Sequence, residues 1–72
     1  MLDSNPSYSI VRLASVIKLT GLSRSTIYDK QNPKSPRYDH TFPKKVSLGP
    51  RAVGWYFSEI EAWLKSIRTH KL

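Results

Sequence analysis

A single glycine between two short helical segments constrains the fold of this chain more than any other feature of its sequence. Apolar residues recur at helical spacing from Leu13 to Thr20, after a β-favouring run over residues 10–13. Gly21 follows directly, and glycine readily adopts the left-handed conformation that ends a helix. The sequence therefore predicts a short strand and then a short helix that stops at Thr20.

The residues after this glycine predict a second helix, which is unusually hydrophilic. Ser23 is a favourable N-cap for a helix over residues 24–30, and Asn32-Pro33 ends it. A short apolar helix, a glycine turn and a polar helix with one inward position form the pattern of a helix-turn-helix. The residues predicted to make its internal contacts are Val16, Ile17, Leu22 and Ile27.

Positive charge dominates the chain and is concentrated in its middle. Twelve Lys and Arg against five Asp and Glu give a formal net charge of +7. Seven of the basic residues and only two acidic ones lie between Arg24 and Arg51. Such a surface attracts polyanions, because each phosphate that it neutralises releases condensed counterions. Nucleic acid is therefore the leading partner that this charge predicts.

The exposed face of the polar helix is the predicted DNA-reading surface. A helix that enters the major groove by its N-terminus offers hydroxyls and backbone amides to phosphates, and Arg24 can donate to both O6 and N7 of guanine. The contacts predicted on this helix are Ser23, Arg24, Ser25, Thr26, Tyr28 and Lys30. Asp29 opposes phosphate binding and is assigned no contact; its candidate partners are Arg24 and Lys30. The alternative for the Ser-Arg-Ser-Thr run is an ordinary capped helix start.

A loop and a hairpin are predicted to follow the polar helix. Residues 31–41 contain two prolines and no apolar period, which indicates a surface loop. Residues 42–48 and 52–57 are β-favouring runs on either side of Gly49-Pro50-Arg51, which has the composition of a hairpin tip. This hairpin is the expected wing of the domain.

Three cations of the wing are predicted to hold the DNA backbone beside the polar helix. Lys44 and Lys45 are expected on its first strand and Arg51 at its tip, where Arg51 could also probe a minor groove. The alternative is a charged hairpin that faces only solvent.

The last helix is the best specified element of the sequence. Ser58 is its predicted N-cap, and Glu61 completes a capping box. Its apolar face, expected in the core with Trp63 as the anchor, consists of Ile60, Trp63, Leu64 and Ile67. The order of strand, helix, helix, loop, hairpin and helix predicts a mainly α fold with a small β-hairpin (α+β), a winged helix-turn-helix.

The chain resembles the AlpA family of prophage regulators, relatives of excisionases and of MerR-type winged helix-turn-helix domains. The residues that carry the resemblance are Arg12-Leu13, Leu19-Thr20-Gly21-Leu22-Ser23-Arg24-Ser25-Thr26-Ile27-Tyr28, Phe42-Pro43-Lys44, Leu48-Gly49, Arg51-Ala52-Val53-Gly54-Trp55, Ser58-Glu59-Ile60 and Ala62-Trp63-Leu64. It implies binding to the DNA of an integrated element, to regulate transcription or to direct excision. It also implies DNA-recognition positions at residues 23–26 and 28 and a wing arginine at Arg51. The chain departs from the pattern at residues 31–41, a stretch longer than in the shortest members.

Catalysis, metal binding and membrane binding find no support in the sequence. The chain has no cysteine, and its two histidines, His40 and His70, lie in the predicted loop and tail without an acidic cluster. No apolar run is long enough to span a membrane, and no segment has the basic amphipathic pattern of a membrane-surface helix. We therefore expect a non-enzymatic protein without cofactor or metal.

One domain over residues 10–69 is predicted, with a flexible arm at residues 1–9 and a tail at residues 70–72. The expected location is the bacterial cytoplasm, at the nucleoid, and integrase, RNA polymerase and further copies of the chain on DNA are additional partners considered. A competing hypothesis is a protein-interaction module in which Trp55, Tyr56 and the basic hairpin bind an acidic partner such as a recombinase. RNA binding ranks below both, because no GXXG loop or exposed aromatic sheet is evident.

Overall fold

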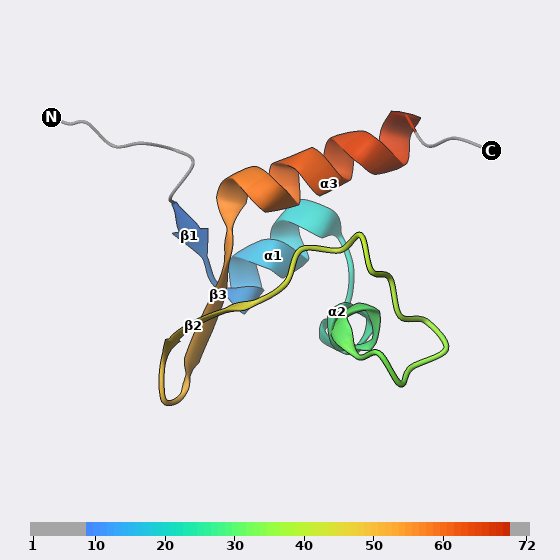
Figure 1. Cartoon of the computed structure of the whole chain (residues 1–72). Helices are drawn as coiled ribbons and strands as arrows, with labels where there is room; N and C mark the ends of the chain where they lie inside the picture. Colours follow the sequence, from blue (N-terminus) through green and yellow to red (C-terminus); the bar gives the residue numbers. More distant parts are fainter. Residues whose placement is uncertain (1–8, 70–72) are drawn as a thin grey trace, which may run out of the picture.

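The computed structural model describes residues 9–69, and within them the chain forms three helices and a three-stranded antiparallel sheet (Figure 1). The elements are β1 (Ile10–Val11), α1 (Leu13–Thr20), α2 (Arg24–Gln31), β2 (Val46–Gly49), β3 (Ala52–Tyr56) and α3 (Phe57–Thr69). The predicted class, a mainly α winged helix-turn-helix with a small β component, is confirmed. The predicted tail and all but Ser9 of the predicted arm lie outside the described residues.

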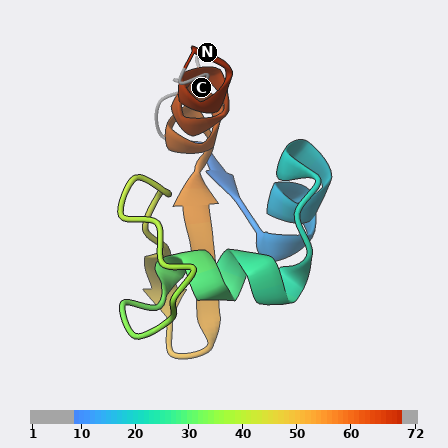
Figure 2. The same cartoon turned by 90° about the vertical axis from the view of Figure 1, so that its right-hand side faces the viewer.

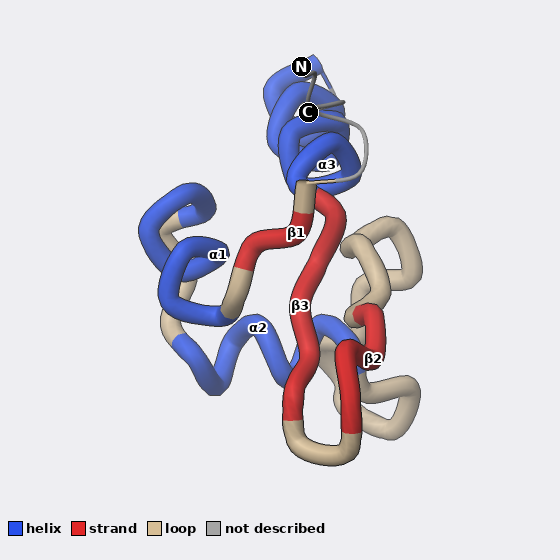
Figure 3. Tube along the Cα trace, turned by 90° about the vertical axis from the view of Figure 1, so that its left-hand side faces the viewer, coloured by secondary structure: helices blue, strands red, loops and turns tan. Residues whose placement is uncertain are grey.

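The central strand of the sheet is β3, with β1 on one side and β2 on the other (Figure 3). Val46 of β2 pairs with Gly54, and Val11 of β1 pairs with Trp55. The hairpin is therefore joined by a third strand, because the short run before α1 adds to the free edge of β3. This first strand stops at Val11, two residues earlier than expected, since Arg12 already occupies the N-cap of α1.

Close backbone approach at Gly54 allows β1 and the hairpin to meet. Gly54 is buried, and a Cβ atom built there would collide with the Ile10 side chain and lie 3.0 Å from the carbonyl oxygen of Val11. A side chain at this position would push β1 away from β3. The absence of one lets β1 pair closely with β3.

The first hairpin strand is shorter than predicted. It begins at Val46, so Lys44 and Lys45 precede the strand and do not lie on it. Pro43 has no amide hydrogen to donate to a strand ladder. Phe42 turns inward and packs edge-to-face against Trp63, with ring centroids 4.9 Å apart. The predicted hairpin tip is confirmed at Pro50 and Arg51, which connect the two strands, whereas Gly49 is the last residue of β2.

The core collects side chains from every part of the described chain. Its buried residues are Val16, Ile27, Phe42, Trp55, Ile60 and Trp63, with Ile17, Leu22 and Leu64 among the partly buried residues packed against them. The predicted contacts within the helix-turn-helix are thus confirmed. Val16 of α1 and Ile27 of α2 have no exposed surface, so both helices of the helix-turn-helix are held by the core.

Two predictions about the last helix are wrong. Helix α3 begins at Phe57, two residues earlier than an N-cap at Ser58 would give, so Ser58 lies in its first turn and is not the N-cap. The strand predicted to include Phe57 therefore ends at Tyr56. The Phe57 amide donates to the Ser9 carbonyl at 2.8 Å, which carries the β1–β3 pairing directly into the helix. Ile67 is 49% exposed, because the end of α3 extends past the small core (Figure 1).

Candidate nucleic-acid interface

The turn between α1 and α2 is held by hydrogen bonds that fix the angle of the second helix. Gly21 has φ 75°, in the left-handed region, and its amide donates to the Ile17 carbonyl at 2.8 Å. The Thr20 hydroxyl donates to the Val16 carbonyl at 2.7 Å and accepts from the Leu22 amide at 3.2 Å. The predicted glycine turn is confirmed, and Thr20 adds a clasp that the helical pattern alone did not reveal.

Helix α2 begins with the predicted cap. The Ser23 hydroxyl oxygen accepts from the Thr26 amide at 3.2 Å and donates to the Thr26 hydroxyl at 2.9 Å. These two hydroxyls are therefore engaged with each other. The first turn of α2 has no acidic residue, and Arg24 lies where the helix dipole disfavours a cation. This turn therefore attracts an anion, although the same arrangement of charge does not stabilise the helix.

The outward face of α2 is the one expected from the sequence. Arg24 and Ser25 are exposed, and Tyr28 is 42% exposed, whereas Ile27 is fully buried. Helix α2 crosses in front of the hairpin when the molecule is seen from the side in Figure 2. Helix α2 and the hairpin tip both lie in the lower part of the molecule, away from α3 (Figures 1 and 2).

The charged residues at the end of α2 are tied to the loop that follows. The Lys30 ammonium lies 3.8 Å from the Asp39 carboxylate and 5.7 Å from the centre of the Trp63 ring. Asp29 pairs with Arg37 at 3.5 Å, and not with Arg24 or Lys30 as expected. Lys30 therefore faces into the molecule, because α3 and the loop meet on that side of α2.

Gln31 is the last residue of α2, and the prediction that it begins the loop is wrong. The indole N–H of the buried Trp55 donates to the Gln31 side-chain oxygen at 3.1 Å. A buried indole needs an acceptor, and one further helical residue supplies it. This bond joins β3 to the end of α2. Its sequence signal is weak, because the two residues lie far apart in the chain.

Residues 32–41 form an ordered series of turns. Asn32, Ser35 and Asp39 each accept, through a side-chain oxygen, the amide two residues ahead, at 3.0, 3.1 and 2.9 Å. Such side-chain turns stabilise the backbone where no helix or strand continues. The Asp39 amide also donates to the Lys30 carbonyl at 3.0 Å, so the loop is fixed to α2 at its far end as well.

Asp39 is the centre of a small polar network. Its carboxylate accepts from the Thr41 amide at 2.9 Å and from the Thr41 hydroxyl at 2.5 Å, and that hydroxyl accepts from the Trp63 indole at 3.3 Å. Partial burial raises the pKa of Asp39. The Thr41 hydrogen bonds, the Lys30 charge and Trp63 together outweigh burial, so the pKa lies below its ordinary value.

Asp39→Asn is expected to destabilise the fold at neutral pH and to have little effect in acid. Asparagine keeps an oxygen for Thr41 but loses the charge that attracts Lys30. A carboxyl with a lowered folded-state pKa stabilises the fold above its ordinary pKa of 3.8. That contribution disappears as the pH falls through the folded-state pKa.

Thermal melts would measure this effect. At pH 7 the variant should melt roughly 4–8 °C below the wild type, equivalent to about 1 kcal/mol in a domain of this size. The difference should shrink as the pH is lowered toward about 3. A difference that stayed constant across this range would show that the charge of Asp39 does not stabilise the loop.

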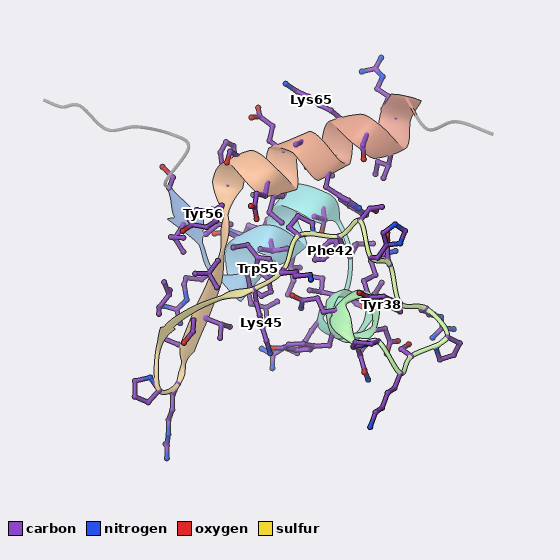
Figure 4. The ribbon with its side chains drawn as sticks, viewed as in Figure 1. Tyr38, Phe42, Lys45, Trp55, Tyr56 and Lys65 are labelled. Carbon is purple, nitrogen blue, oxygen red and sulfur yellow. The ribbon has the colours of Figure 1, made fainter. Side chains whose placement is uncertain are left out.

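The basic residues before and at the tip of the hairpin are exposed. Lys44 and Lys45 line, together with Lys30, a pocket of about 340 Å³ next to the end of α2. Figure 4 shows Lys45 between the hairpin and α2. Arg51 lies at the hairpin tip. The structure thus places cations at the end of α2, before the hairpin and at the hairpin tip.

Arg12 is a positioning residue that sequence reasoning missed. Its guanidinium Nε donates to the carbonyl oxygen of Val53 in the hairpin at 2.9 Å, across 41 positions of sequence. Arg12 is also the N-cap residue of α1, without a side-chain capping bond. It therefore connects the start of the helix-turn-helix to the hairpin.

The protein-interaction hypothesis loses its central residue. Trp55 has no exposed surface and lies in the middle of the molecule, whereas Tyr56 is only partly buried and lies beside β1 (Figure 4). A fully buried indole cannot contact a partner, so the expected aromatic patch on the hairpin is absent. The basic hairpin itself remains exposed.

Within residues 9–69, the chain offers neither a metal site nor a membrane-spanning helix. No group of three or more His, Cys, Asp or Glu side chains there could hold a metal ion. None of the helices in this part of the chain has the length and apolar character needed to cross a membrane.

Comparisons with known proteins extend over the same part of the chain. The family model described as "Prophage CP4-57 regulatory protein (AlpA)" matches residues 9–69. A relative from Escherichia coli (strain K12), described as "DNA-binding transcriptional activator AlpA", is 54% identical over 63 residues, which are 88% of this chain and 90% of that protein. An "Uncharacterized protein ORF88" of Enterobacteria phage P4 is 43% identical over 54 residues, 75% of this chain and 54% of that protein. No solved structure matches significantly. The chain therefore belongs to the AlpA family of prophage regulatory proteins.

Proposed function

We propose that this chain is a sequence-specific DNA-binding regulator of a prophage or integrative element. The observation that carries the proposal is the exposed, acid-free first turn of α2 beside a basic hairpin, in a chain of net charge +7. The printed description of the Escherichia coli relative as a DNA-binding transcriptional activator supports it at 54% identity. The same surface would serve a transcriptional regulator or an excisionase, since both bind repeated sites in duplex DNA.

Helix α2 is the part that we place in the major groove. Arg24 reads a guanine through O6 and N7, and Ser25 and Tyr28 lie on the same exposed face. Ser23 contributes its backbone amide, because its hydroxyl is engaged in the cap. The Thr26 amide is also engaged there, but the Thr26 hydroxyl only accepts from Ser23 and keeps its own hydrogen to donate to a phosphate.

The remaining proposed contacts are to the DNA backbone. Lys44 and Lys45 neutralise phosphates between the helix and the hairpin, and Arg51 reaches a neighbouring phosphate or the minor groove. Lys30 adds a more distant charge, since its ammonium faces Asp39 and Trp63. No catalytic step is assigned to the chain. Its site of action in this proposal is the bacterial cytoplasm, with integrase or RNA polymerase as protein partners and further copies of the chain on adjacent sites.

The test is a binding series with two classes of duplex. Binding of the wild-type chain to the promoter and attachment-site DNA of its own element is compared with binding to mixed-sequence duplex, across several salt concentrations. We expect a preference for the element's DNA on the order of 10³ or more, and affinity that falls steeply with salt for both. Equal affinity for all duplexes would refute sequence-specific regulation, and absence of salt-dependent binding would refute DNA binding itself.

A further inference from the structure

We propose that the loop of residues 32–41 is a third DNA-contacting element, in which Lys34 and Arg37 bind phosphates beyond the end of α2. This inference rests on the proposed DNA-binding function and adds residues to the interface that the helix-turn-helix and hairpin do not include. The loop would bind the DNA backbone on the side of α2 that the hairpin does not reach.

The position of the loop is the first argument. Figure 1 shows α2 end-on, with the hairpin on one side and the 32–41 loop on the other. In all three ribbon and tube views, the hairpin tip, α2 and the lower part of the loop form the same end of the molecule (Figures 1, 2 and 3). A duplex that receives α2 in its major groove therefore has backbone facing the loop as well as the hairpin.

The distribution of charge in the loop is the second argument. The carboxylate of Asp39, the loop's own acidic residue, faces Thr41 and Lys30. Lys34 and Arg37 are exposed, and no carboxylate within residues 9–69 lies within ion-pair distance of Lys34. Anionic groups of the loop are thus turned inward and its cations outward.

Arg37 has a further effect on the electrostatics of α2. It pairs with Asp29, the acidic residue of that helix, although the Arg37 side chain remains 77% exposed. An exposed ion pair is weak, so the guanidinium can hold Asp29 and a phosphate together or exchange one for the other. In either case the negative charge that opposes DNA on α2 is compensated by the loop.

Rigidity is the third argument. Besides its three side-chain turns, the loop has backbone hydrogen bonds from Ser35 to Asn32 at 2.9 Å and from Tyr38 to Ser35 at 3.0 Å. Long loops without helix or strand are uncommon in compact domains and are often functional. A loop already ordered in the free protein loses little conformational entropy when its cations bind phosphates.

The measurement that tests this proposal is the slope of log affinity against log salt concentration. The probe is a mixed-sequence duplex of about 30 base pairs, close to three helical turns. Each phosphate contact contributes about 0.9 to the slope, so Lys34→Ala should lower it by roughly that amount. Lys65→Ala is the matched control, because it removes the same charge from the side of α3 that lies away from α2 (Figure 4).

Arg37 requires a second background, because Arg37→Ala also leaves Asp29 unpaired. Arg37→Ala is therefore introduced into an Asp29→Asn background, in which that carboxylate is already absent. The double variant is compared with Asp29→Asn alone. A slope about 0.9 lower in the double variant than in Asp29→Asn is the expected result. Circular dichroism and thermal melting confirm that each variant is folded.

The outcomes separate this proposal from the proposed function. Wild-type binding with a steep salt slope that drops in the loop variants, but not in Lys65→Ala, supports the loop contact. If the wild type binds steeply and the loop variants match Lys65→Ala, the loop proposal is overturned while DNA binding stands, and an acidic protein surface becomes the partner for these cations. If the wild type shows no salt-dependent binding, both proposals are overturned.

Discussion

Ile60→Ala should lower the free energy of unfolding by about 2–5 kcal/mol, whereas Ile67→Ala on the same helix should lower it by less than about 1 kcal/mol. Ile60 has no exposed surface and belongs to the central cluster, so its loss leaves a cavity among packed neighbours. Ile67 is 49% exposed and leaves none. Alanine also has the higher helix propensity, which offsets part of either loss.

Chemical denaturation of the two variants, monitored by circular dichroism, measures this difference. Small domains have a total stability on the order of 5–15 kcal/mol, so Ile60→Ala could unfold a large fraction of the protein at 37 °C. Similar losses for both variants would show that the end of α3 packs against something in solution, either another copy or the rest of the chain. Because the substitution and the helix are identical, only burial distinguishes the pair.

Arg24→Ala should weaken binding to the preferred DNA of the element by about 1–3 kcal/mol, roughly 5- to 150-fold, and relax its sequence preference. Arg24 follows the N-cap of α2, is exposed, and lies where the helix dipole disfavours a cation. Its removal should therefore leave folding intact or slightly improved. A measured loss of affinity would then come from the interface.

Lys45→Ala is the comparison for this variant. Lys45 lies between the hairpin and α2 (Figure 4), where it can reach a phosphate but no base is assigned to it. It should weaken binding to preferred and mixed-sequence duplexes by the same factor and lower the salt slope by about 0.9. Equal losses on every duplex for both variants would contradict the assignment of Arg24 as the base-reading residue.

Features governed by local rules could be predicted from the sequence. The left-handed Gly21, the Ser23 cap and the inward position of Ile27 all depend on residues within a few positions of each other. The hairpin tip at Pro50 and Arg51 is of the same kind. These short-range preferences sufficed for the order of elements and for the exposed face of α2.

Features that depend on tertiary contact could not be predicted in this way. Helix α2 extends to Gln31 because the buried indole of Trp55 requires an acceptor. Asp29 pairs with Arg37, which the folding of the loop brings back to the helix. Ile67 follows the periodicity of α3 but lies beyond the end of the core. The apolar periodicity of a helix does not show how far the core extends along it.

The order of the 32–41 loop had a signal that was available in the sequence. Asn32, Ser35 and Asp39 are all residues whose side chains favour turns, and each lies two positions before the amide that it accepts. Prolines and the absence of an apolar period indicated a loop correctly. They did not distinguish a mobile loop from one whose turns are individually capped.

The hairpin is held at its base by β1 and by the direct continuation of β3 into α3, and nearer its tip by the Arg12 bond to Val53. The distance between the hairpin and α2 is consequently fixed by these contacts and by the core, so it cannot change to fit the groove. Under the proposed function, the duplex must therefore do the adapting. Base steps that bend or narrow easily would be favoured even where no side chain touches them, so that part of the target preference would be carried by DNA stiffness.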